Sequence, residues 1–129
     1  MSAARIYMSL DRSPSVVRDA RDTLARLLEE RASVSFVRDA LLLTSELVTN
    51  AVVHGNGSCE LRASFTCPPE HLRVDVIDES PDLPVPTTEA LRRARLGGLG
   101  LLLVADVASH WGVDHIAGGA KSVWFELGS

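Results

Sequence analysis

The sequence lacks the features that mark several large classes of protein. Its two cysteines, Cys59 and Cys67, lie eight positions apart, and no CxxC or Cys/His spacing suits a zinc site. We expect both to be small apolar residues at strand ends rather than a disulfide or metal site. No apolar run approaches the roughly 20 residues of a membrane-spanning helix, and the first residues lack a secretory signal pattern. These absences predict a cytoplasmic protein with no membrane association.

Positive charge is also scarce. The formal net charge is −4, the pI is about 5.5, and the one basic cluster is the short run 92–95. An acidic domain without a basic patch is poorly suited to a phosphate backbone, so no nucleic-acid partner is expected. With 129 residues, of which 46% are hydrophobic and 23% charged, the chain has the size and composition of one globular domain, residues 1–129.

Hydrophobic periodicity predicts the order of helices and strands. Residues 5–10 are expected to form a strand, followed by a helix over 14–30 with Ser13 as N-cap and Pro14 in its first turn. Alternating segments at 59–67 and 72–78, and again at 111–117 and 122–128, predict two antiparallel hairpins. A second helix is expected over 35–55, with an apolar row at Phe36, Ala40, Leu43, Leu47 and Ala51.

A loop that contains three prolines follows the first hairpin; after it a short helix is expected over 87–96, and the main apolar helix of this region over 97–110 is the one counted in the order below. The resulting order is strand, two helices, two strands, loop, helix, two strands. It predicts an α+β fold, a two-layer α/β sandwich in which helices cover one face of a mixed, mostly antiparallel sheet.

A polar row interrupts the second helix. Glu46, Asn50 and His54 recur at intervals of four, so on an α-helix they are offset by only about 40° and form one ridge. Such a row is commonly a solvated edge. However, residues 41–55 contain no basic residue and a single acid, and neighbours such as Val53 are apolar. A polar row in dry surroundings needs partners, which makes it a candidate binding site.

Three further motifs bind ligands in some proteins and form ordinary loops in others. Asp78 ends an alternating strand, where a carboxylate either accepts hydrogen bonds or simply forms a turn. The glycine-rich segment 97–101 opens an apolar helix whose free N–H groups can hold an anion, although a lone glycine-rich loop is a weak signal. The segment 118–122 is first of all a hairpin turn.

Taken in order, these motifs resemble the histidine-kinase-like ATP-binding family, which includes gyrase and the sensor kinases. ELVTNAVVHG is similar to that family's N-box, VIDES to its first glycine box and GLGL to its second. The resemblance covers nearly the whole chain and implies the Bergerat ATP-binding fold. TSELVTNAVVHG, DESPDLP and GGAKSVWFEL most resemble the small stand-alone serine kinases that act as anti-sigma factors in actinomycetes.

The resemblance implies a role for each motif. Asn50 would offer a side-chain oxygen to Mg²⁺, whose other ligands are phosphate oxygens and water, and Glu46 would accept the proton of an attacking hydroxyl. Asp78 would accept a hydrogen bond from the adenine amino group, and His54 would bond nearby backbone or phosphate. The other residues assigned to ATP binding are Ser80, Gly98, Leu99, Gly100, Leu101 and Ser122.

Three functions stay open at this point. The first is an ATP-dependent serine/threonine kinase that binds a sigma factor and phosphorylates its antagonist, with a homodimer also allowed by the resemblance. The second is a nucleotide-binding switch between partners without kinase activity, and the third is an interaction module with a vestigial pocket. Retention of Glu46 and Asn50 favours the first. Ser80, which stands where the family has glycine, implies a tighter pocket or weaker nucleotide binding and favours the second.

Overall fold

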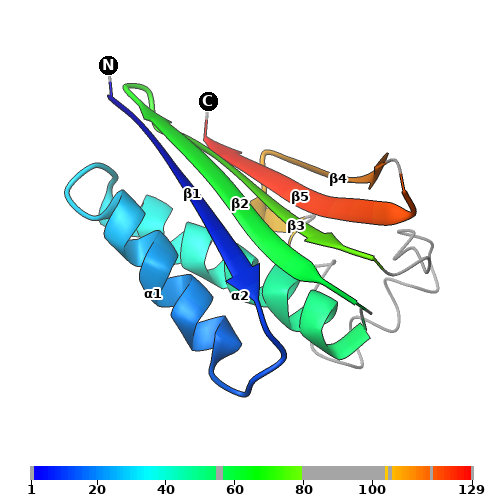
Figure 1. Ribbon diagram of the computed structural model, residues 1–129. Coiled ribbons are helices and arrows are strands. Elements are labelled where there is room, and N and C mark those ends of the chain that lie inside the picture. The colour runs from blue at the N-terminus through cyan, green and yellow to red at the C-terminus, as the bar shows by residue number, and fades with distance from the viewer. Residues whose placement is uncertain (1, 55–56, 80–103, 105, 117, 129) are drawn as a thin grey trace.

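The computed structural model describes residues 2–54, 57–79, 104, 106–116 and 118–128 (Figure 1). The elements in these ranges are, in order, β1 (Ser2–Leu10), α1 (Val16–Leu28), α2 (Val34–His54), β2 (Cys59–Cys67), β3 (His71–Asp78), β4 (His110–Ile116) and β5 (Ala120–Gly128). This order confirms the expected strand, helix pair and two hairpins. The helices expected over 87–96 and 97–110 fall largely outside the described residues. In the described part of the chain, no helix has the length and apolar character needed to cross a bilayer.

The start of α1 differs from the expectation. The helix begins at Val16, and Ser15 rather than Ser13 precedes it. The Ser13 backbone N–H and hydroxyl both donate to Asp11 Oδ1, at 3.0 and 2.6 Å. Ser13 therefore closes the loop before the helix, because the nearby Asp11 carboxylate competes for its hydroxyl.

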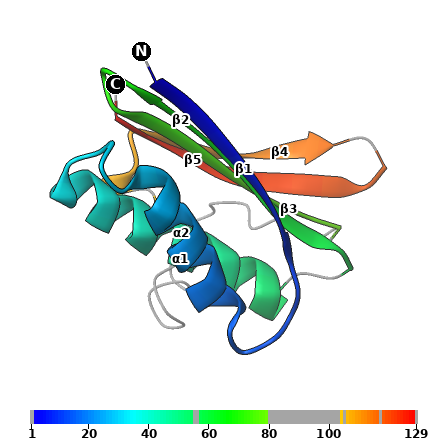
Figure 2. The same ribbon diagram turned by 60° about the vertical axis from the view of Figure 1, so that its left-hand side comes forward.

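The five described strands form one sheet in the order β1-β2-β3-β5-β4, and every neighbouring pair is antiparallel. Both helices cover the same face, α1 beneath β1 and β2, and α2 beneath β2, β3 and β5 (Figures 1 and 2). The expected two-layer α+β architecture is thus confirmed. The register sets Asp78 opposite Cys59 on β2 and opposite Lys121 on β5, so these three residues share one face of the sheet.

The core lies between this face and the two helices. Alternate residues of β2, β3 and β5 are buried in it, as the period of two in a strand requires. The Phe36 ring of α2 meets Phe65 of β2 with ring centroids 5.9 Å apart and planes tilted by 60°, a favourable aromatic arrangement. The expected apolar row of α2 is confirmed, since all of its members are buried: Phe36, Ala40, Leu43, Leu47 and Ala51.

Thr44 places a polar group in this core. It is 0% exposed, and its hydroxyl has no hydrogen-bond partner among the described residues.

Because an unsatisfied buried hydroxyl costs about 1–3 kcal/mol, Thr44→Val is expected to raise the free energy of unfolding by about 1 kcal/mol, measured by urea denaturation. Thr49→Val makes the same change at an exposed position of the same helix and serves as the control. Equal effects of the two variants would trace the gain to helix propensity and not to the hydroxyl.

Candidate functional site

The second half of α2 carries the expected polar row. Glu46 and Asn50 lie one turn apart and are half-buried, whereas His54 is the last residue of the helix and its side chain is outside the described part. Burial raises the pKa of the Glu46 carboxyl above its usual value. The polar row was expected to lie among buried apolar residues, and this expectation is wrong at Val53, which is 65% exposed. The row therefore combines a partly desolvated carboxyl with a helix end that is open to solvent.

Arg12, in the loop after β1, holds the end of α2. Its guanidinium donates to the carbonyl oxygens of Ala51 (3.2 Å) and Val52 (2.7 Å) in the last turns, and to that of Gly57 (3.3 Å) before β2. A cation at a helix C-terminus also interacts favourably with the helix dipole. Sequence reasoning missed Arg12, because its acceptors lie 39 and more positions further along the chain. Through these bonds Arg12 supports the turn of α2 that carries Asn50.

The loop between α2 and β2 also meets the end of β3. The backbone N–H of Ser58 donates to the Glu79 carboxylate at 3.4 Å. Gly57 has a φ of +70°, and a Cβ at this position would overlap the Glu79 carboxylate, so glycine suits the turn on both counts. These contacts bring the last turns of α2 to the end of the sheet where β3 finishes at Asp78.

Replacing Arg12 by alanine is expected to loosen the end of α2 before it loosens the rest of the fold. Loss of the carbonyl contacts should cost about 1 kcal/mol and increase amide hydrogen exchange over residues 50–58 more than over the N-terminal half of α2. Hydrogen-exchange mass spectrometry measures both segments. Arg18→Ala, on the exposed side of α1, removes the same charge and is the control. A uniform increase along α2 in both variants would contradict the role given to Arg12.

Asp78 forms a buried ion pair on the helix-facing side of the sheet. It is 3% exposed and Lys121, directly opposite on β5, is 6% exposed. Lys121 Nζ lies 3.9 Å from Asp78 Oδ1, and such pairing is how proteins tolerate buried charges. Sequence reasoning missed Lys121. The signal that could have found it is that the only lysine of the chain stands at an inward position of an alternating strand.

Cys59, the neighbour of Asp78 on β2, is a buried free thiol. Burial and, to a smaller extent, the Asp78 charge raise the pKa of this thiol to about 11. It is therefore protonated and a poor nucleophile near neutral pH. Cys67, at the other end of the strand, is also free. The two cysteines thus lie at strand ends without a disulfide, as expected.

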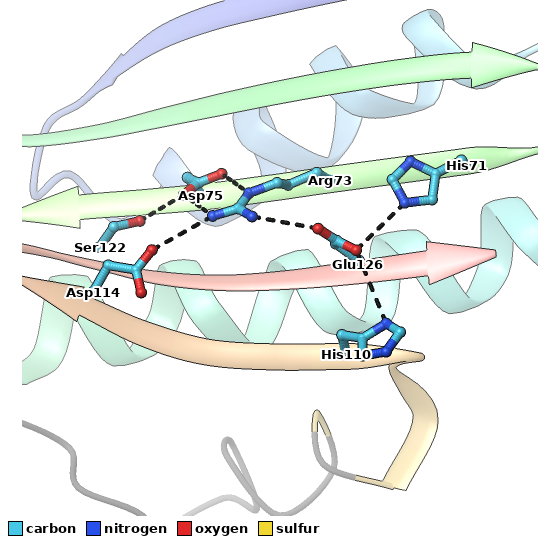
Figure 3. A network of polar contacts seen from close by, with 7 residues as sticks. All are labelled: His71, Arg73, Asp75, His110, Asp114, Ser122 and Glu126. Atoms are coloured by element: carbon cyan, nitrogen blue, oxygen red, sulfur yellow. Dashed lines mark hydrogen bonds and ion pairs between the residues drawn. The ribbon is translucent and has the colours of Figure 1, made fainter. Parts of the chain in front are cut away.

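The face of the sheet away from the helices carries a second polar cluster (Figure 3). Its centre is Arg73 on β3, which donates to Asp75 (2.8 Å) and Glu126 (3.3 Å) and lies 4.2 Å from the centre of the Trp124 ring. The hydrogen bond to Asp75 is the main reason why the pKa of Arg73 is raised above its usual value. The residues drawn in this cluster are His71, Arg73, Asp75, His110, Asp114, Ser122 and Glu126.

Ser122 belongs to this outer cluster. Its hydroxyl donates to Asp75 Oδ2 at 2.8 Å. Lys121, the preceding residue, faces the helices beside Asp78, because successive residues of a strand point to opposite faces. Ser122 and Asp78 therefore lie on opposite faces of the sheet, and the nucleotide-binding role expected for Ser122 stays a prediction.

Of the predicted residues, Glu46 and Asn50 lie on the C-terminal half of α2, and the loop that follows this helix contacts the chain next to Asp78, through the bond from Ser58 to Glu79. Among the described residues, no three His, Cys, Asp or Glu side chains converge as a metal site. Asn50 carries a neutral side-chain oxygen, a kind of ligand that Mg²⁺ can take together with water. The predictions for five residues lie outside the described part of the chain and stay predictions: Ser80, Gly98, Leu99, Gly100 and Leu101.

Comparison with known proteins agrees with this arrangement. Residues 10–126 match the family described as histidine kinase-like ATPase domain. A search of curated protein sequences gives no match. Among solved structures, the RsbU and RsbW domains of Rv1364c from Mycobacterium tuberculosis resemble the chain in fold, with a TM-score of 0.68 and 24% identity. The likeness covers 96% of this chain and 31% of the longer one. By its family match, the chain belongs to the histidine kinase-like ATPases.

Proposed function

We propose that this domain binds ATP with Mg²⁺ and transfers the γ-phosphate to a serine or threonine of a partner protein, as an anti-sigma-factor kinase. The observation that carries the proposal is the half-buried carboxyl of Glu46, whose pKa is raised, one turn before the amide of Asn50. Both lie on the half of α2 that leads to β2, whose first residue Cys59 pairs with Asp78. A base beside a nucleotide site is the part that a kinase needs and a plain binding module does not.

Two residues support nucleotide binding. When it is ionised, the buried Asp78 carboxylate accepts hydrogen bonds and cannot donate them. The adenine amino group is a hydrogen-bond donor and would suit it. The Asn50 side chain has a neutral oxygen, a ligand that Mg²⁺ accepts alongside phosphate oxygens and water. Bound Mg²⁺ would neutralise phosphate charge during transfer.

Glu46 would supply the base. The partner's hydroxyl gives its proton to the Glu46 carboxylate while its oxygen attacks the γ-phosphorus. A new O–P bond forms, the bond from the γ-phosphorus to the β–γ bridging oxygen breaks, and ADP leaves with that oxygen. Raising the pKa of Glu46 by burial strengthens it as a base.

A protein substrate needs access to this base, and the surface of α2 supports such access. Thr49 and Val53, on the same half of the helix as Glu46 and Asn50, are both exposed. The nature of the partners, a sigma factor and an antagonist that carries the phosphorylated residue, rests on the resemblance of the motifs to anti-sigma kinases. The similarity in fold to a chain that includes an RsbW domain agrees with this.

Nucleotide titration followed by a transfer assay tests the proposal. The purified chain is titrated with ATP and ADP, with and without Mg²⁺, by calorimetry. Partners are then identified by pull-down with ATP, with ADP and without nucleotide, and each is incubated with γ-labelled ATP to detect phosphoserine or phosphothreonine. Binding with label transfer is the expected result. Nucleotide binding without label transfer would reject the kinase and favour a nucleotide-dependent switch between partners, the function that Ser80 favours. Absence of nucleotide binding would reject both the kinase and the switch.

A further inference from the structure

The sheet has one face that neither described helix covers, because α1 and α2 both pack on the other (Figures 1 and 2). On this open face the middle of β1, β2 and β3 forms a hollow of about 410 Å³. The side chains that line it are Arg5, Tyr7, Arg62, Ser64, Arg73 and Asp75. The register sets Ser64 directly between Arg5 on β1 and Arg73 on β3. A short side chain therefore stands between two long cationic ones, which leaves room for a ligand.

Arginine N–H groups without acceptors line this hollow. Arg5 is exposed, and neither its guanidinium nor the Ser64 hydroxyl has a partner among the described residues. Arg62 is also exposed; it donates to Glu60 at 2.7 Å and lies over the Tyr7 ring, 5.5 Å from its centre. Since a guanidinium has five N–H donors, most of those on Arg5 and Arg62 stay free. A ligand of this hollow must therefore supply acceptors.

The acidic residues of the open face do not supply them. Asp75 already accepts hydrogen bonds from Arg73 and Ser122. Glu60, the one acidic residue in the sequences of β1 and β2, accepts from Tyr7 and Arg62.

The charge of the open face changes sign across the sheet. The β1–β2 half carries the cations Arg5 and Arg62, whereas Asp114 and Glu126 lie on β4 and β5 at the other side. An anionic partner is thus attracted to the β1–β2 half and repelled from the β4–β5 half, and such complementarity sets both the position and the specificity of docking.

The spacing of the two free arginines suits an extended polypeptide. Arg5 pairs with Ser64, and Arg62 stands two residues before Ser64 on β2, so the two arginines are diagonal neighbours, roughly 7–8 Å apart. In an extended chain, side chains on one side recur at every second residue, about 7 Å apart. Two carboxylates at alternate positions can therefore meet both arginines, and the two oxygens of each match the fork of a guanidinium.

We propose that the open face of the sheet docks an extended acidic segment of another protein, in which Asp or Glu at alternate positions binds Arg5 and Arg62. The docking face lies away from α2, so a partner bound there leaves Glu46 and Asn50 accessible. The inference does not depend on nucleotide binding, and either proposal can fail while the other holds.

A dye-labelled peptide in which serine and glutamate alternate is the probe, and fluorescence anisotropy with the full chain measures its affinity. A peptide with glutamine in place of glutamate is the control and should bind at least about tenfold more weakly. The affinity for the acidic peptide should fall as salt is raised, because the pairs are exposed. Equal binding of the two peptides would overturn the inference. Displacement of the acidic peptide by equimolar inorganic phosphate, or tighter binding of a labelled oligonucleotide, would also overturn it.

Variants on the two faces of the sheet locate the binding. Arg5→Gln combined with Arg62→Gln should lower the affinity for the acidic peptide at least about tenfold, without changing ATP titrations or thermal unfolding, since both residues are exposed. Arg18→Gln, on the exposed side of α1, removes a charge from the opposite layer and should leave the affinity unchanged. The same loss in Arg18→Gln as in the double variant would reduce the effect to net charge and overturn the docking site.

A third variant tests the part given to Arg62 by a gain of affinity. Glu60→Gln removes the carboxylate that accepts from Arg62 at 2.7 Å, so it frees this guanidinium for the peptide. The affinity for the acidic peptide should rise at least about twofold, the size expected when a competing exposed ion pair is removed. Unchanged or weaker binding in Glu60→Gln would overturn the role of Arg62.

Discussion

Glu46→Gln is expected to reduce phosphate transfer by about 10²–10⁴-fold while nucleotide binding persists. Glutamine has nearly the shape of glutamate, but its amide cannot take the proton of the attacking hydroxyl. Calorimetry should therefore show ATP binding in the variant, and the rate of label transfer to the partner should show the loss. Glu29→Gln, at an exposed position after α1, removes one carboxylate away from the site and should leave the rate unchanged.

The pH dependence of the rate of phosphate transfer is a second test of the role of Glu46. A general base acts in its ionised form, so transfer falls as the pH drops through the pKa of Glu46. Because burial raises this pKa above the usual value of 4.5, the acidic limb of the rate profile should lie above pH 4.5 in the native protein. Glu46→Gln should lack this limb. Transfer at the native rate by the variant, or an unchanged acidic limb, would show that Glu46 is not the base.

Asp78→Asn is expected to abolish most of the affinity for ATP and also to destabilise the fold. The neutral amide no longer offers a charged acceptor to the base, and Lys121 loses the charge that faces it at 3.9 Å. Breaking a buried pair by changing one partner typically costs about 3 kcal/mol. Urea denaturation measures the free energy of unfolding, and calorimetry well below the unfolding transition measures the affinity.

The double variant Asp78→Asn with Lys121→Met separates these two effects. It removes both charges, so much of the lost stability should return, whereas ATP affinity should stay low because the acceptor is still missing. The coupling between the two sites is read from the cycle of single and double variants. Full ATP affinity in Asp78→Asn would remove Asp78 from base recognition, and a double variant as unstable as the single one would show that the pair does not cause the loss.

The layers of the fold could be predicted from the sequence because burial in them follows simple periods. The apolar row of α2 from Phe36 to Ala51 faces the sheet, and Asp78 ends its strand, as the patterns indicate. The predicted start of α1, with Ser13 as N-cap, was wrong because the neighbouring Asp11 carboxylate accepts the hydrogen bond of the Ser13 hydroxyl. Such competition between neighbouring side chains is invisible to a periodic pattern.

The candidate site was harder to predict because it depends on strand register. Lys121 and Ser122 are adjacent in sequence, and the motif drew attention to Ser122. In the sheet Lys121 faces Asp78, whereas Ser122 bonds Asp75 on the other side. A shift of one residue exchanges the two faces of a strand. Arg12 was missed for a related reason, since its bonds cross the gap between β1 and the end of α2.

The burial of Lys121 also determines how readily its amine is modified, by enzymes in the cell or by reagents in vitro. Acetylation, ubiquitin attachment and amine-directed crosslinking all need an accessible lysine amine, and the only lysine of this chain is 6% exposed beside a carboxylate. Such reagents reach Lys121 only when the end of the sheet around β3 and β5 opens, either locally or together with the whole fold. The rate of lysine modification in this protein is therefore a measure of how often the candidate site opens.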